Sequence, residues 1–86
     1  MNRYVIPGTD QTKFAIEKNV LGFWEPKEEG ILTSGLTLTI GEVVMIVNPD
    51  KDRCLRTSFV QEILETTALS VTFKTMNSIY RIRAVK

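Results

Sequence analysis

The fold is decided by residues 53–83, RCLRTSFVQEILETTALSVTFKTMNSIYRIR, which contain the clearest β pattern of the chain. Within this stretch, residues 69–75 alternate strictly between apolar and polar side chains. Residues 79–85 alternate again, with Tyr80, Ile82 and Ala84 on one face and Ile79, Arg81, Arg83 and Val85 on the other. Alternation with a period of two is typical of strands that bury one face. Met76-Asn77-Ser78 lies between the two segments and has the composition of a turn. The stretch therefore predicts an antiparallel hairpin.

Three more strands are predicted upstream of this hairpin. Residues 36–40 alternate, Gly41 interrupts, and residues 43–47 are continuously apolar, which indicates one long strand bent at the glycine. Asn48-Pro49-Asp50-Lys51-Asp52 has the residues of a hairpin loop. The predicted strands together cover residues 12–18, 36–47, 54–65, 69–75 and 79–85.

Five short, turn-separated strands without a crossover helix predict an all-β fold, and we expect a small antiparallel five-stranded barrel of the SH3-like kind. An OB-like barrel and a small β-sandwich are the alternatives. The 86 residues form a single domain, in which residues 1–11 are an arm or an edge strand. A core of this size is marginal, so self-association into a homo-oligomer would add buried surface.

Two segments allow more than one interpretation. Residues 14–19 and 58–66 have spacings that also fit a helix. Phe23 and Trp24 precede a polar segment, Glu25–Gly30, that we interpret as a loop. This aromatic pair is expected either to plug the end of a barrel or to form a protein interface or stacking platform.

Composition excludes several kinds of chemistry. The chain has no histidine and one cysteine, Cys54, so it lacks the ligands of a zinc site and the partners of a Ser/His or Cys/His nucleophile. We expect no cofactor, no metal and no enzymatic activity. No apolar run approaches the length of a membrane span, and Met1–Ile6 is too short for a signal peptide, so a cytoplasmic protein without a membrane partner is expected.

Charge is distributed unevenly along the chain, although the net charge is only +1. Residues 1–43 carry four basic and six acidic residues, and residues 44–86 carry seven basic and four acidic ones. A basic stripe with neighbouring hydroxyl and amide groups is a candidate surface for phosphates or nucleobases. The predicted nucleic-acid-binding or nucleotide-binding residues are Arg56, Thr57, Ser58, Lys74, Asn77, Ser78, Tyr80, Arg81 and Arg83. The competing interpretation is that the hydroxyls cap turns and that the stripe is a solvated strand face.

Part of the chain resembles small accessory proteins of bacteriophages and prophages. The shared pattern is Leu38-x-x-Gly41-Glu42, then Arg56-Thr57-Ser58-x-Val60, then Phe73-x-Thr75-x-Asn77-Ser78-x-Tyr80-x-Ile82. The resemblance implies a small β fold and a binding role inside a host cell, and it carries over no catalytic residue.

The sequence thus leads to three hypotheses of function. The first is a phage-type accessory protein that modulates or inhibits a host defence system by binding a host protein or a signalling nucleotide. The second is a small barrel that binds RNA or single-stranded nucleic acid. The third is a minor structural or assembly protein.

Overall fold

The computed structural model describes residues 2–85, which form an all-β fold of nine strands without a helix. The strands are β1 (Arg3–Val5), β2 (Phe14–Val20), β3 (Phe23–Leu32), β4 (Thr37–Thr39), β5 (Met45–Asn48), β6 (Arg53–Arg56), β7 (Val60–Thr66), β8 (Ser70–Thr75) and β9 (Ile79–Ala84). Seven of them form one antiparallel sheet in the order β6-β5-β3-β2-β9-β8-β7, and β1 pairs with β4 in a second sheet. The predicted all-β class is confirmed, and the predicted number of five strands is wrong.

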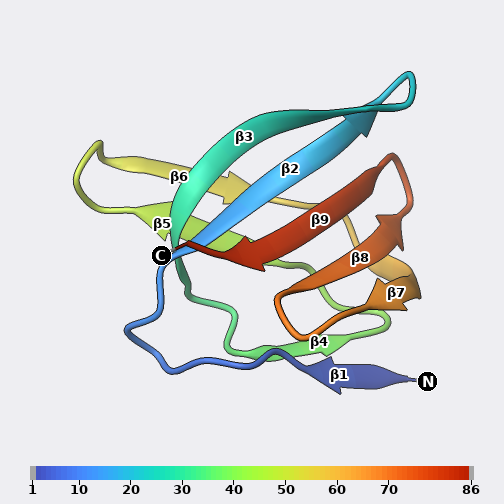
Figure 1. The fold of residues 1–86 in the computed structure, drawn as a ribbon, viewed down its shortest axis with the longest axis horizontal. Coiled ribbons are helices and arrows are strands. Elements are labelled where there is room, and N and C mark those ends of the chain that lie inside the picture. Colours follow the sequence, from blue (N-terminus) through green and yellow to red (C-terminus); the bar gives the residue numbers. More distant parts are fainter. Residues whose placement is uncertain (1, 86) are drawn as a thin grey trace.

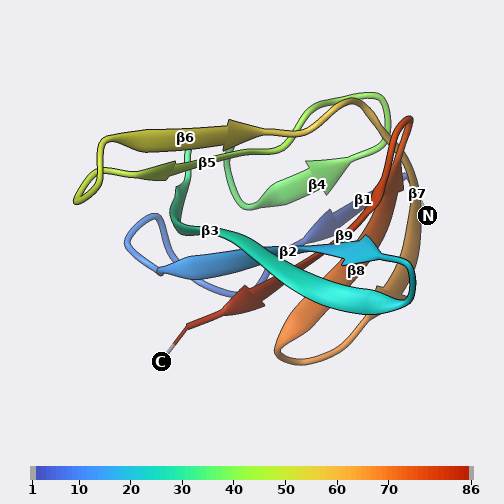
Figure 2. The same cartoon turned by 90° about the horizontal axis from the view of Figure 1, so that it is seen from above.

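The large sheet curves back on itself, so that the β5–β6 hairpin lies across from β2, β9 and β8, while β1 and β4 lie along the side (Figure 1, Figure 2). Two backbone hydrogen bonds join the segment after β4 to the start of β7: Gly41 N donates to Val60 O at 2.8 Å, and Val60 N donates to Glu42 O at 2.8 Å. Within residues 2–85, β6 and β7 do not pair with each other. The described strands therefore form no closed barrel.

The hydrophobic core fills the inside of this curve. Phe14 and Ile16 of β2 point inward, as their alternation predicts, and meet Phe73 of β8 and Ile82 of β9. The further buried members of the core are Ile6, Leu32, Leu38, Val44, Ile46, Val60 and Val71. Almost every strand contributes to one shared core, which holds the two sheets together.

The segment Glu25–Gly30 is part of strand β3, so its interpretation as a loop is wrong. β3 pairs with β2 from Phe23 to Gly30, and it pairs with β5 only at Ile31 and Leu32. Pro26 is tolerated because the outer edge of β3 has no strand partner at that position. Lys27 is the extra residue of a β-bulge, which locally disrupts the period on which strand prediction depends.

Two predicted strands are each divided in the structure. Gly41, with a φ of 94°, lies in the connection between β4 and β5 and does not bend one continuous strand. The predicted strand over residues 54–65 stops at Arg56 and resumes at Val60 as β7. Residues 14–19 and 58–66 contain no helix. The hairpin of residues 69–75 and 79–85 is present as β8 and β9, which pair from Ser70 and Arg83 to Lys74 and Ile79.

Candidate functional site

Within the predicted hydroxyl and amide cluster, Thr57 is engaged in the fold through its side chain, whereas Ser58, Asn77 and Ser78 take part through their backbone groups. Thr57 is buried, its Oγ1 donates to Ser58 O at 2.8 Å, and it accepts a hydrogen bond from Val44 N at 3.1 Å. Thr75 Oγ1 accepts from the backbone N–H groups of Asn77 and Ser78 and donates to Ser78 O, which closes the β8–β9 turn. These contacts are those of turn caps, which is the competing interpretation of the cluster.

Tyr80, Arg56 and Lys74 of the predicted set lie on three different strands, β9, β6 and β8. The ring of Tyr80 stacks on Phe73 with the centroids 5.8 Å apart, at the margin of the core, so Phe73 covers one face of the ring. Arg56 is exposed at the end of β6. Lys74 is exposed on β8, opposite Ile79 of β9 and Glu62 of β7.

Arg81, Arg83 and Trp24 come together on the outer face of the sheet, around a residue that the sequence analysis did not single out. Glu17 Oε1 lies 2.9 Å from Arg81 Nη2 and 3.4 Å from Arg83 Nε, and it accepts from Arg81 Nε at 3.0 Å. The guanidinium of Arg81 also lies 4.4 Å from the centre of the Trp24 ring. Such a cation–π contact contributes about 0.5–1 kcal/mol. The single Glu17 carboxylate therefore offsets part of the positive charge of Arg81 and Arg83, and Trp24 does not plug the end of a barrel.

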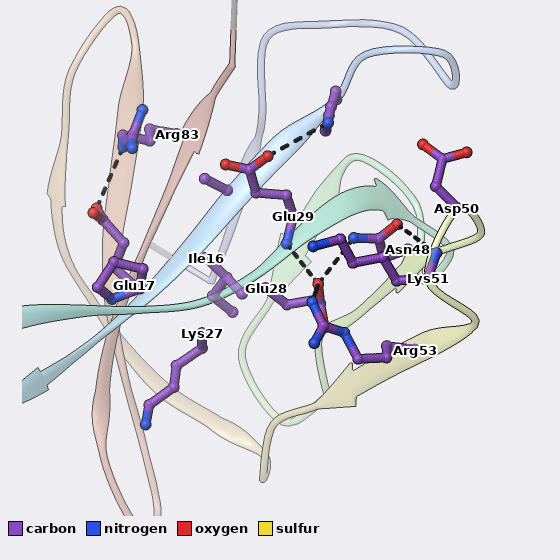
Figure 3. A pocket seen from close by; sticks show the side chains of 13 residues that line it. Ile16, Glu17, Lys27, Glu28, Glu29, Asn48, Asp50, Lys51, Arg53 and Arg83 are labelled. Carbon is purple, nitrogen blue, oxygen red and sulfur yellow. Dashed lines mark hydrogen bonds and ion pairs between the residues drawn. The ribbon is translucent and has the colours of Figure 1, made fainter.

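A cleft of about 420 Å³ opens where β3 leaves β5, between the β2–β3 hairpin and the β5–β6 turn (Figure 3). Most of the residues that line it are charged. The lining residues are Lys13, Ala15, Ile16, Glu17, Pro26, Lys27, Glu28, Glu29, Asn48, Asp50, Lys51, Arg53 and Arg83. Lys13 pairs with Glu29 at 3.4 Å, and Lys27 pairs with Glu25 at 2.7 Å. None of the described lining residues is aromatic, so a bound base would have no ring on which to stack.

Glu28 is the most enclosed acid of this cleft. Its side chain is only 6% exposed, and its carboxylate accepts from Asn48 Nδ2 at 3.1 Å and from Glu29 N at 3.1 Å. Arg53 Nε lies 3.0 Å from the second carboxylate oxygen (Figure 3). The Asn48 amide, the Glu29 N–H and then the Arg53 guanidinium lower the pKa of Glu28, against the opposing effect of burial. The group fastens β3 to the β5–β6 hairpin beyond the point where their backbones separate.

Among residues 2–85, the large apolar side chains with the highest exposed fractions lie at the tip of the β2–β3 hairpin. The tip is a two-residue loop, Leu21-Gly22, and both residues have positive φ, at 52° and 89°. Positive φ at both positions is the signature of a type I′ turn. The side chain of Leu21 is 95% exposed and that of Phe23 is 78% exposed. The last pair between β2 and β9 is Lys18 with Tyr80, so the tip extends past β9 without a second neighbour.

Within residues 2–85, no group of three or more His, Cys, Asp or Glu residues is arranged as metal ligands. The same residues include no helix long and apolar enough to cross a membrane. Comparison of the chain with known proteins found no matching family model, no matching curated protein and no matching solved structure.

Proposed function

We propose that this protein is a non-enzymatic binding module that recognises another protein through the tip of its β2–β3 hairpin. The observation that carries the proposal is Leu21. A left-handed backbone costs a non-glycine residue about 1–2 kcal/mol, and Asn, Asp or Gly is the usual choice at this turn position. Leu21 adopts that backbone and also leaves its side chain almost fully in water. Neither property benefits folding, so an external partner is the simplest use for the side chain.

Leu21 is not the only exposed apolar residue among residues 2–85 at this end of the sheet. Phe23 follows Leu21 on the same hairpin, and the exposed residues Phe59 and Met76 lie where β7 begins and β8 ends. The register of β2, β9, β8 and β7 places these positions at one end of the sheet. Exposed apolar side chains gathered on one side of a small protein are typical of a protein-binding surface. The phage-type resemblance would make the partner a host protein.

The other hypotheses have weaker support. Arg81 and Arg83 are already paired with Glu17, which reduces their value for phosphates in an RNA-binding protein. A signalling nucleotide would have to enter the charged cleft and displace ion pairs there. The finer classification as SH3-like also remains a proposal, supported by the antiparallel strands and the short β8–β9 turn.

The test is a comparison of variants in affinity capture from bacterial lysate. We expect Leu21→Asn combined with Phe23→Thr to lose the partner that the parent protein retains, because the apolar contact is removed. Leu69→Thr is the matched control, since Leu69 is 64% exposed but lies at the opposite end of the sheet, before β8. Equal capture by the double variant and the parent would refute the proposal. Thermal unfolding of each variant shows that lost binding does not come from lost folding.

A further inference from the structure

The outer part of the β2–β3 hairpin extends beyond the sheet as a ribbon of two strands. β2 pairs with β9 only as far as Lys18 and Tyr80, and β3 pairs with β5 only at Ile31 and Leu32. Within the described chain, residues 19–24, which we call the tip ribbon, therefore pair only with each other. Two strands without a third neighbour are marginally stable in water. The orientation of the tip ribbon relative to the sheet thus depends on side-chain contacts.

Arg81 makes such a contact from the middle of the sheet. It lies opposite Glu17 on β2 and opposite Thr72 on β8, so its strand is paired on both sides. Its guanidinium lies 4.4 Å from the centre of the ring of Trp24, which belongs to the tip ribbon and pairs with Asn19. Because β2 lies between β9 and β3, the side chain of Arg81 crosses β2 and connects the paired part of the sheet to the tip ribbon.

Glu17 holds the guanidinium of Arg81 in this place. Its Oε1 accepts from Arg81 Nε at 3.0 Å and lies 2.9 Å from Arg81 Nη2. The side chain of Glu17 is 10% exposed and that of Arg81 is 30% exposed, so both charges are largely removed from water. A cation that is partly removed from water attracts the face of an aromatic ring more strongly than a hydrated one does. The contact with Trp24 is therefore made by a cation whose position is already fixed.

We propose that Arg81 is a positioning residue, which holds the tip ribbon in the orientation that presents Leu21 and Phe23 to the partner. The inference rests on the proposed function for the use of the tip, and on the contact with Trp24 for the positioning. A partner binds only the fraction of molecules whose tip is correctly oriented, so its apparent affinity falls with that fraction. A tip that is ordered beforehand also loses less conformational entropy on binding.

The first experiment measures the motion of the tip ribbon without any partner. The chain has one tryptophan, so fluorescence anisotropy reports Trp24 alone. We expect Arg81→Gln to lower this anisotropy and to speed hydrogen exchange of the amides of residues 19–24 about two- to fivefold, the factor that corresponds to one cation–π contact. Arg83→Gln is the matched control, because it takes the same charge from the same strand and the same carboxylate but leaves the contact with Trp24 in place.

Two further variants separate positioning from a general loss of stability. Arg81→Lys keeps a cation beside the ring, so it should restore most of the anisotropy that Arg81→Gln loses. Trp24→Leu removes the contact from the other side and keeps the ion pair with Glu17, so it serves if Arg81→Gln does not fold. Its tip ribbon should also exchange faster, and the combined variant should exchange little faster than either single one. Additive effects, or equal motion in Arg81→Gln and Arg83→Gln, would overturn the proposal.

The second experiment relates this positioning to binding. Across a series of bait concentrations, the protein that the parent captures from bacterial lysate should bind Arg81→Gln about two- to fivefold more weakly, and Arg83→Gln as well as the parent. Equal binding by Arg81→Gln and the parent would refute the positioning role while leaving the tip as the binding surface. If Leu21→Asn combined with Phe23→Thr loses nothing, the proposed function fails instead, and the anisotropy and exchange rates still decide whether Arg81 holds the tip ribbon.

Discussion

The two ends of the β2–β3 hairpin differ in how far packing within the chain explains their residues. At the base, Phe14 is buried opposite Gly30, and the backbone of Gly30 lies so close to β5 that a Cβ would overlap the carbonyl oxygen of Val47. At the tip, Leu21 adopts a left-handed backbone and leaves its side chain in water. Packing inside the chain explains the residues of the base. It does not explain those of the tip, and this difference directs the search for function to the tip. The four substitutions below test the difference, in order of decreasing effect.

The largest effect is expected from Gly30→Ala at the base. The added methyl group meets backbone atoms of β5, which cannot rotate away as a flexible side chain would. We expect a loss of about 3 kcal/mol or more in the free energy of unfolding, or failure to fold. Urea denaturation measures it, with Thr33→Ala, an exposed site just after β3, as the control. An unfolding midpoint equal to that of the parent would show that β3 and β5 can move apart far enough to accommodate the added methyl group.

Glu17→Gln is expected to have the next largest effect, in the middle of the hairpin. The change leaves the guanidinium groups of Arg81 and Arg83 without their common counter-charge while preserving the shape of the side chain. Because the Glu17 side chain is mostly buried, the loss should be about 1–3 kcal/mol. Glu29→Gln is the matched control, since its ion pair with Lys13 is about half exposed and should change stability by less than about 0.5 kcal/mol. The same denaturation experiment serves both variants, and equal losses would contradict the assigned role of burial.

Glu28→Gln is expected to have an effect that depends on pH. The pKa of Glu28 is lowered in the folded protein, so its contribution is complete above the carboxyl value of the unfolded chain and is lost as the pH falls through the lower folded value. The melting temperature of the parent should therefore exceed that of Glu28→Gln near neutral pH. This difference should shrink as the pH falls below about 4.5. Thermal melts from pH 7 downward measure it, and a difference that stays constant with pH would argue against the ionised Glu28 as the cause.

Leu21→Asn is expected to have the smallest effect on stability, and the effect has the opposite sign. Asparagine tolerates a left-handed backbone better than leucine does, so we expect a gain of about 0.5–1 kcal/mol. The variant should be more stable than the parent and still bind the partner less well. Such a separation of stability from binding would sharpen the contrast between base and tip. A variant that is less stable than the parent would mean that Leu21 contributes to the fold.

Strands could be predicted from the sequence where one of their faces is buried and the other is exposed to solvent. The β8–β9 hairpin and the β5–β6 turn were predicted for this reason, since alternation and turn residues are local signals. The division of residues 36–47 was missed, because Gly41 in a strand-like pattern is compatible with both a bend and a break. β3 was missed because proline and glycine usually mark loops. No local sequence signal shows that Pro26 lies at an open edge of β3, or that Gly30 lies against the backbone of Val47.

The predicted site residues were harder to judge from sequence. Arg81 and Arg83 share one face of the sheet with Lys74, as the register of β8 and β9 shows. Their neutralising partner, Glu17, lies 64 residues from Arg81 in the sequence, and only the pairing of β2 with β9 brings the two together. Glu17 lies within the predicted strand over residues 12–18, and its alternation with the apolar Phe14 and Ile16 is the only local sign of its outward position. The exposure of Phe23 could not be predicted, since an aromatic beside a glycine is equally compatible with a core position.

The pairing of β2 with β9 also determines the order in which the strands can pair during synthesis. β2 can join β3 as soon as the hairpin has been synthesised, but its other edge waits for β9, because Phe14 pairs with Ala84. At about 5–20 residues per second, ribosomes make the intervening segment in several seconds. During that interval an apolar strand with an open edge is accessible to chaperones and proteases. The charged run Glu17-Lys18 on β2 is well placed to limit aggregation of the nascent chain.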